Sequence, residues 1–294
     1  MPDSESTEIT ADAAEMTHDL VRTHYIGARD LTSWPSRTGQ ATVRVALNVH
    51  DAWRSRLNER SSPYVVLLVT TLIGLLVTAV FTAASAAIYD NVTDRDGVAG
   101  LDQPVLDQMV AWRNPTVNRV VTDFTNLGGP RLMPIFGLAA ALLLARWWHS
   151  WTPILLIAIA AGGSLALTVV GKQVIDRARP PTNLAVPPYE TSASFPSGHS
   201  LNGWVILLMV AYLVCCRAEH RRWRIAAVAT ALVLAVALGL SRVYLGHHWL
   251  TDVLVAWTLG SAWLIVVISG HRLALTVVRR RTPGAAHALP DSAT

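Results

Sequence analysis

The chain has 294 residues, of which 52% are hydrophobic and only 15% are charged. Soluble globular domains carry about 25% charged residues, so this composition indicates an integral membrane protein and excludes a disordered chain or a small disulfide scaffold. The net charge is +4, and much of the basic excess lies beside apolar runs, which favours membrane orientation over nucleic-acid binding.

The first 60 residues form a polar segment with many acidic side chains, which we expect to be a cytoplasmic tail. They contain no basic stretch followed by a short apolar one, so we expect no cleavable secretory signal. From Arg44 to Leu57 apolar and polar residues alternate. This part is either a helix that lies on the membrane surface or a partly ordered part of the tail, and the pattern does not separate the two.

Six apolar runs predict six transmembrane helices. They cover residues 64–88, 132–148, 153–170, 201–216, 225–240 and 250–269. A helix needs about 20 residues to cross a membrane, with about 17 as the lower limit. The fourth and fifth runs reach this length only when they are extended through His199 and Ser200 and through Ser241 to Tyr244. The predicted fold is therefore an all-α, polytopic membrane helical bundle.

We expect this bundle to occupy residues 61–270, between the N-terminal tail and a basic cytoplasmic tail at 271–294. If the N-terminus is cytoplasmic, more basic residues lie at the cytoplasmic span ends than at the opposite ends. Because cytoplasmic loops are enriched in arginine and lysine, this asymmetry predicts that both termini are cytoplasmic.

Residues 101–129, between the first two runs, carry apolar residues at helical spacing that Asn114 and Pro115 interrupt. This pattern predicts two short helices, which we interpret as a cap on the outer membrane surface. A purely structural cap is the simpler interpretation, and a role in admitting substrate is the alternative.

Three polar clusters stand at the ends of the predicted spans, where polar side chains are energetically costly and their presence therefore indicates a function. The first runs from Lys172 to Pro180, the second is Pro196–His199, and the third runs from Ser241 to Asp252. The predicted topology places all three on the outer face of the membrane. We therefore expect them to converge on one site.

Lys172, Arg179 and Arg242 provide three cations for such a site. Arginine presents a planar fork that suits phosphate oxygens, and lysine provides a compact point charge. Lys172 is the only lysine of the chain. Ser197 and Gly198 stand at a predicted helix start, where a hydroxyl and backbone N–H groups favour an anion. Together these residues predict a cradle for a phosphate group.

His248 and Asp252 are four residues apart, a spacing that places both side chains on one face of a helix. A carboxylate bonded to one ring nitrogen orients an imidazole and leaves the other nitrogen free to attack. His199, on a separate segment, can protonate a leaving oxygen. His247 slightly favours a metal site instead, but the chain has no H-E-x-x-H motif and no cysteine–histidine cluster. We interpret the set as a phosphoryl-transfer site that needs no metal.

The three clusters resemble the signature of the type 2 phosphatidic acid phosphatase (PAP2) superfamily, which reads K-x6-R-P, P-S-G-H and S-R-x5-H-x3-D. Every fixed position of this signature matches in order, and the resemblance covers about residues 64–270. It implies a six-span helical bundle, related to that of the haloperoxidases, with its site on the outer face. It also implies that His248 is the nucleophile that forms a phosphohistidine, that Asp252 orients it and that His199 is the general acid. Phosphate would be held by Lys172, Arg179, Ser197, Gly198 and Arg242, with no metal or other cofactor.

The resemblance implies a membrane hydrolase that removes phosphate from a lipid phosphate or pyrophosphate of the phosphatidic acid type. The alternatives are a polyprenyl (undecaprenyl) pyrophosphate phosphatase of the same superfamily, a phosphotransferase with the same site, or a non-catalytic lipid binder or transporter. The six apolar runs argue against the soluble acid phosphatases and the vanadate-dependent haloperoxidases of the superfamily. We expect a lipid phosphate and the bilayer as partners, no nucleic acid, and a site on the extracytoplasmic face of the plasma or inner membrane. The sequence predicts no oligomeric state.

Overall fold

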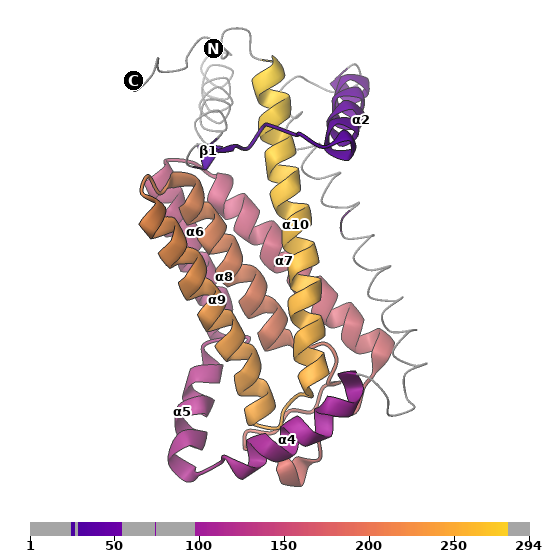
Figure 1. Cartoon of the computed structure of the whole chain (residues 1–294), viewed down its shortest axis with the longest axis vertical. Helices are drawn as coiled ribbons and strands as arrows, with labels where there is room; N and C mark the ends of the chain where they lie inside the picture. Colours follow the sequence, from indigo (N-terminus) through magenta and orange to yellow (C-terminus); the bar gives the residue numbers. More distant parts are fainter. Residues whose placement is uncertain (1–24, 27–28, 55–73, 75–97, 282–294) are drawn as a thin grey trace, which may run out of the picture.

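The computed structural model describes residues 25–26, 29–54, 74 and 98–281 (Figure 1). Within them, five long helices pack side by side as a bundle, and shorter elements lie at its two ends. The bundle helices are α6 (Leu132–Trp148), α7 (Thr152–Ile175), α8 (Gly198–Arg217), α9 (Arg221–Tyr244) and α10 (Leu250–Arg281).

Five of the six predicted spans fall on described residues, and all five form helices. Four of them, α7 to α10, are long and apolar enough to cross a membrane, whereas α6 has 17 residues and is shorter. The extended ends of the fourth and fifth runs are confirmed, since α8 begins at Gly198 and α9 ends at Tyr244. The first predicted span, 64–88, lies outside the described residues except for Gly74, so the count of six remains a prediction.

Helix α8 is the centre of the bundle, because it packs against α6, α7, α9 and α10. Its buried apolar residues are spaced by one helical turn: Leu201, Val205, Met209 and Leu213. Lipid tails are as apolar as leucine, so close packing and hydrogen bonds hold such helices together. Trp263 of α10 shows both: its indole donates to the Ala160 carbonyl at 3.0 Å, and a methyl group on Gly163 would lie 2.2 Å from its ring.

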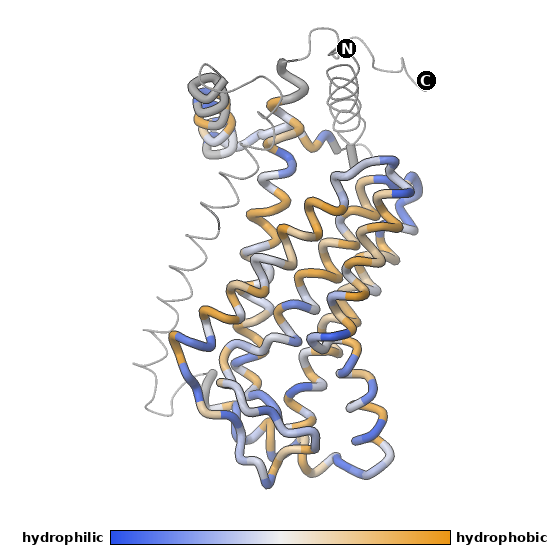
Figure 2. The backbone as a smooth tube through the Cα atoms, turned by 180° about the vertical axis from the view of Figure 1, so that it is seen from behind, coloured by the Kyte–Doolittle hydropathy of each residue, from blue (hydrophilic) through white to orange (hydrophobic). Residues whose placement is uncertain are grey.

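The outer surface of the bundle is apolar. Leu143 of α6 is 71% exposed and Val233 of α9 is 67% exposed, although both are large hydrophobic residues. Figure 2 shows hydrophobic residues along the middle of the bundle helices and hydrophilic residues gathered towards their ends. This distribution is typical of a protein whose sides contact lipid and whose ends contact water.

One end of the bundle is covered by η2 (Val98–Leu101), α4 (Asp102–Ala111) and α5 (Pro115–Asn126) (Figure 1). The two short helices predicted on either side of the Asn114–Pro115 interruption are thus confirmed. The Asn114 side chain accepts a hydrogen bond from the Val117 amide at 2.9 Å and so caps α5, with proline in the first turn.

At the opposite end, an N-terminal segment packs beside the last turns of α10 (Figure 1). It contains the antiparallel pair β1 (Tyr25–Ile26) and β2 (Arg29–Asp30) and the helix α2 (Arg37–Arg54). Val43 of α2 is buried against Leu273. The part of residues 44–57 that the structure describes is therefore helical, and its contact with a membrane surface remains a prediction.

Arg272 of α10 fastens this segment. Its guanidinium donates to the carbonyls of Leu31 at 2.8 Å and Ser33 at 2.9 Å and stacks on the ring of Trp34. Helix α10 continues to Arg281, past the boundary at residue 270 that we expected for the bundle. The segment around residues 31–43 thus contacts the same helix that carries the basic C-terminal residues.

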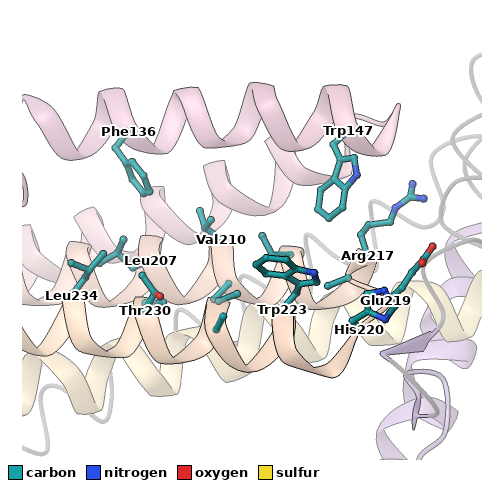
Figure 3. Close-up of a pocket in the computed structure, with 16 residues that line it drawn as sticks. Phe136, Trp147, Leu207, Val210, Arg217, Glu219, His220, Trp223, Thr230 and Leu234 are labelled. Carbon is teal, nitrogen blue, oxygen red and sulfur yellow. The ribbon is translucent and has the colours of Figure 1, made fainter.

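A hollow of about 850 Å³ opens between α6, α8 and α9 (Figure 3). Phe136 and Trp147 of α6 line one side, and Trp223 and Leu234 of α9 line the other. Arg217 at the end of α8 marks the α8–α9 turn, so the hollow reaches towards the end of the bundle away from α4 and α5. It contains none of the residues of the three polar clusters.

Candidate active site

The three polar clusters meet at the end of the bundle that carries α4. Lys172 lies in the last turns of α7 and Gly198 begins α8, while Arg242 lies in the last turn of α9 and Asp252 in the first turn of α10. The connection from α7 to α8 and the connection from α9 to α10 therefore both lie at this end of the bundle. The functional groups come from four helices and from the loops that join them.

Close backbone packing sets the second cluster beside the first. A methyl group on Gly171 would lie 2.6 Å from the Pro196 ring, so a larger residue next to Lys172 would push the loop away. The Ser194 amide donates to the Arg177 carbonyl at 2.8 Å and ties the loop to the end of α7. These contacts fix where α8 begins.

His248 lies in the loop before α10 and not on a helix, so the expectation that it shares a helical face with Asp252 is wrong. The two side chains still meet, because Asp252 turns back from the first turn of α10. Its Oδ2 accepts the Trp249 amide at 3.0 Å, as an acidic residue does at a helix start, and faces His248 Nδ1 at 3.5 Å. The carboxylate therefore caps the helix and faces the imidazole at the same time.

Two further donors hold the Asp252 carboxylate, which is completely buried. Ser194 Oγ donates to Oδ2 at 2.5 Å, and Arg177 Nη1 donates to Oδ1 at 2.6 Å. Each oxygen thus has a strong partner besides the histidine. The imidazole presents Nδ1 to this carboxylate, and its Nε2 lies 3.2 Å from Arg179 Nη1.

His248 is neutral at physiological pH. Burial lowers the pKa of its imidazole to about 4, although the hydrogen bond and charge of Asp252 oppose this shift. The charges of Arg179 and Arg242 lower the pKa further. A neutral imidazole with one nitrogen beside a carboxylate is the form that can act as a nucleophile.

Arg179 and Lys172 both bond to the loop that precedes α8. Arg179 donates through Nε to the Ser192 carbonyl and through Nη1 to the His247 carbonyl, each at 2.6 Å. Lys172 Nζ lies 3.3 Å from Ser192 Oγ and donates to the Ala193 carbonyl. The same loop residues thus hold both cations of the first cluster, and Arg179 also lies beside His248.

Arg242 lies deeper, with its side chain 2% exposed. Its Nη1 is 3.5 Å from Thr125 Oγ1 of α5, a hydroxyl that also receives a hydrogen bond from Ser241 Oγ at 2.8 Å. Its Nε is buried and finds no hydrogen-bond partner among the described residues. A buried guanidinium with donors to spare is unusual and indicates a site for an anion.

Glu190 pairs with two of these arginines. Its Oε2 is 3.0 Å from Arg179 Nη2, and its Oε1 accepts a hydrogen bond from Arg242 Nη2. Burial by itself raises the pKa of this carboxyl, but the charges of Arg242 and Arg179 outweigh burial and lower the pKa to about 2. Glu190 is therefore ionised at every physiological pH.

The remaining predicted residues lie around the start of α8. Ser197 stands at the N-cap position, where its buried side chain accepts from Ser200 Oγ at 2.8 Å and does not cap the helix. Gly198 is the first helical residue, so its amide belongs to the free N–H groups of a helix start. His199 follows in the first turn, and its Nε2 would lie 3.5 Å from a methyl group on Gly129.

Asp102 and Arg177 take part in the site although sequence reasoning did not select them. Asp102 of α4 is buried and accepts from the Thr251 amide at 2.9 Å and from Thr251 Oγ1 at 2.6 Å. Arg177 Nη2 lies 2.7 Å from Asp102 Oδ2, while its Nη1 reaches Asp252. Arg177 thus joins the cap helix α4 to the carboxylate that faces His248.

Sequence signals existed for two of the missed residues. Arg177 stands inside the first cluster, between Lys172 and Arg179, and Glu190 is the only acidic residue between Asp176 and Glu219. No pattern marked Ser194 or Asp102, because a serine near a proline and an aspartate at a helix start are both common.

The arrangement joins a neutral, oriented imidazole to three cations from separate elements. Such a site can bind a dianion through the arginines and transfer a phosphoryl group to His248. In the described ranges, no three histidine, cysteine, aspartate or glutamate side chains are grouped so that they could hold a metal ion.

Comparison with known proteins gives consistent matches. Residues 151–274 match the model of the PAP2 superfamily. Phosphatidylglycerophosphatase B of Bacillus subtilis (strain 168) is 33% identical over 185 residues, which are 61% of this chain and 85% of that protein. An undecaprenyl-diphosphatase of Sulfolobus acidocaldarius is 35% identical over 109 residues, which are 34% of this chain and 46% of that protein.

A solved structure is similar as well. The crystal structure described as the first transmembrane PAP2 type phosphatidylglycerolphosphate phosphatase from Bacillus subtilis aligns with a TM-score of 0.56 and 30% sequence identity. The alignment covers 66% of this chain and 93% of that one.

Proposed function

The chain belongs to the PAP2 superfamily, and from this premise we propose that it is a membrane lipid phosphatase that works through a phosphohistidine on His248. The observation that carries the proposal is the setting of this imidazole. Nδ1 faces the buried Asp252 carboxylate at 3.5 Å, and Nε2 lies 3.2 Å from the Arg179 guanidinium. The reactive nitrogen thus lies beside one of the cations that would hold a phosphate.

The first step transfers the phosphoryl group to the enzyme. Nε2 of His248 forms a bond to phosphorus while the bond from phosphorus to the lipid oxygen breaks, and His199 donates a proton to that oxygen. Asp252 balances the positive charge that develops on the imidazole. Arg179, Arg242 and Lys172 stabilise the charge on the phosphoryl oxygens.

The second step releases the phosphate. A water molecule attacks phosphorus, the phosphorus–nitrogen bond breaks, and His199 accepts a proton from the water. Inorganic phosphate leaves, and both histidines return to their starting forms. Ser197 and Gly198 would contribute at the start of α8, where backbone N–H groups favour an anion.

A glycerophospholipid with a terminal phosphate monoester is the substrate class we favour, with phosphatidylglycerol phosphate as the first to test. Support comes from the name of the bacterial relative and from its 85% coverage by this chain. A polyprenyl pyrophosphate is the second candidate, because the undecaprenyl-diphosphatase match has similar identity over a shorter stretch. Both substrates present a terminal phosphate to the same three cations.

The site would face the extracytoplasmic side. Arg217, Arg221, Arg222 and Arg224 gather at the α8–α9 turn, and α2 and the end of α10 lie at that same end of the bundle. Basic residues favour the cytoplasmic side, which leaves the α4 end and His248 outside and both termini inside. An accessible label on Arg119→Cys, at the α4–α5 end, but not on Glu219→Cys in intact cells would support this orientation.

Phosphate release by the purified chain in detergent tests the proposal. The substrates are phosphatidylglycerol phosphate, phosphatidic acid and undecaprenyl pyrophosphate, each measured with EDTA. We expect His248→Ala to abolish release, since it removes the nucleophile. The matched control is His220→Ala, an exposed histidine at the opposite end of the bundle, and it should retain full activity. Near-normal turnover by a folded His248→Ala protein would refute the mechanism.

A further inference from the structure

Glu190 occupies a central position that the proposed reaction does not use. Its two carboxylate oxygens bond to two guanidinium groups from different elements, those of Arg179 and Arg242. The arginine side chains are 12% and 2% exposed, whereas the glutamate side chain is 30% exposed. The glutamate side chain is therefore more exposed to solvent than either of the arginine side chains with which it pairs.

A carboxylate and a phosphate group compete for the same donors. Both present a pair of oxygens to the planar fork of arginine, and both form the strong, charge-assisted kind of hydrogen bond. Nε and Nη1 of Arg179 already donate to the carbonyls of Ser192 and His247. Nη2 of Arg179 lies 3.0 Å from both Glu190 Oε2 and Ser192 Oγ, and Nη2 of Arg242 donates to Glu190 Oε1. A substrate phosphate that binds these two guanidinium groups would therefore compete with Glu190 for their Nη2 donors, while Arg242 Nε remains a further donor.

The loop that carries Glu190 is fastened on both sides. The Val186 amide donates to the Leu245 carbonyl at 2.8 Å, and the Ser194 amide donates to the Arg177 carbonyl at the same distance. The backbone ends of this stretch are therefore held. Exchange of the carboxylate for a phosphate requires rotation of the glutamate side chain and leaves these anchors in place.

We propose that Glu190 is an internal competitor for the phosphate site, which a substrate displaces only when it carries a terminal phosphate group, as a phosphate monoester does. This inference rests on the proposed function. A phosphate monoester brings close to two negative charges at neutral pH and gains more from the arginines than one carboxylate does. A phosphodiester brings one charge and gains no such advantage. Glu190 thus lowers the affinity for every anion and selects the monoester among the many phosphodiester lipids of a membrane.

Inhibition of the full chain in detergent tests this role. Orthovanadate and phosphatidylglycerol, a phosphodiester lipid, are used as competitors for the wild type, for Glu190→Gln and for Glu190→Ala. Glu219→Gln, an exposed glutamate at the opposite end, is the matched control. We expect the vanadate inhibition constant to fall about tenfold in both Glu190 variants, the effect of one charge contact of ordinary strength. Phosphatidylglycerol should inhibit these variants and not the wild type or the control.

The direction in which the vanadate inhibition constant changes distinguishes a competitor from a residue that positions the arginines. If Glu190 instead positions the two arginines, its loss weakens vanadate binding, and an unchanged or raised inhibition constant overturns the proposal. Vanadate binding is also measured without turnover, as the rise in Tm that the anion produces. If the Glu190 variants bind vanadate more tightly but the wild type hydrolyses no lipid, the competitor role of Glu190 is supported and the proposed phosphatase activity is refuted. If the wild type hydrolyses lipid and the Glu190 variants bind vanadate as the wild type does, the phosphatase activity is supported and the competitor role of Glu190 is refuted.

Discussion

Replacing Arg177 with methionine should lower kcat about thirtyfold and leave KM close to that of the wild type. Arg177 donates to Asp252 Oδ1 at 2.6 Å and pairs with Asp102 at 2.7 Å, and neither carboxylate belongs to the residues predicted to hold phosphate. Methionine keeps an unbranched apolar stem and removes the charge and its donors. The change therefore acts on His248 through the carboxylate that faces it.

The size of the expected loss in kcat depends on which hydrogen-bond donors Asp252 and Asp102 keep when Arg177 is replaced. Removing one partner of a buried ion pair costs about 3–5 kcal/mol when the other charge is left alone. Asp252 keeps donors in Ser194 and the Trp249 amide, and Asp102 keeps both donors of Thr251. We therefore expect about half of that cost, ~2 kcal/mol, in the transition state, which is about thirtyfold in rate.

Steady-state kinetics on the purified chain measure this effect, together with phosphate inhibition. Arg177→Lys should recover part of kcat, since a lysine can reach one of the two carboxylates. Arg119→Met, at an exposed arginine of α5, is the control and should behave as the wild type. Unchanged kcat in Arg177→Met would refute the positioning role, and so would a loss of phosphate inhibition in proportion to kcat.

Two further predictions concern stability and the N-terminal segment. The pKa values of His247 and His248 are lowered from 6.5 to about 4, so the unfolded chain binds more protons than the folded chain between these pH values. Stability should fall as the pH drops from 6.5 towards 4, by up to about 3 kcal/mol for each histidine. Thermal unfolding in detergent at pH 7 and pH 4.5 measures this fall, and an equal or higher Tm at pH 4.5 contradicts it. Arg272→Ala should speed limited proteolysis within residues 29–54 relative to Arg146→Ala, because it removes the contacts to Leu31, Ser33 and Trp34; equal cleavage rates would argue against this attachment.

The sequence predicted the helices of the bundle well because lipid imposes a strong pattern. A run of apolar residues has to satisfy its backbone within one helix when no water is present. Helix α6 accordingly has the bounds of the second apolar run, Leu132–Trp148. The other helices extend past their runs, as α7 does to Ile175, because polar side chains near helix ends find partners in the loops.

The position of His248 shows where spacing alone fails. Gly246 adopts a φ of 72°, and a methyl group there would lie 2.5 Å from the Leu184 carbonyl. Only glycine fits this turn without strain, so the chain reverses before α10 begins and His248 stays in the loop. His248 and Asp252 meet here because Asp252, in the first turn of α10, turns back towards the loop that carries His248.

By itself, the sequence determined the class of protein, the described spans and the residues with suitable chemistry. These properties depend on composition, on the length of apolar runs and on short motifs, all of which are local. The tertiary structure alone decided which charges meet. Glu190 lies 52 residues from Arg242 and Asp102 lies 75 residues from Arg177, and each pair forms only because loops and a cap helix fold over one end of the bundle. Contacts between distant residues depend on how the helices pack, and no periodicity within one segment records that packing.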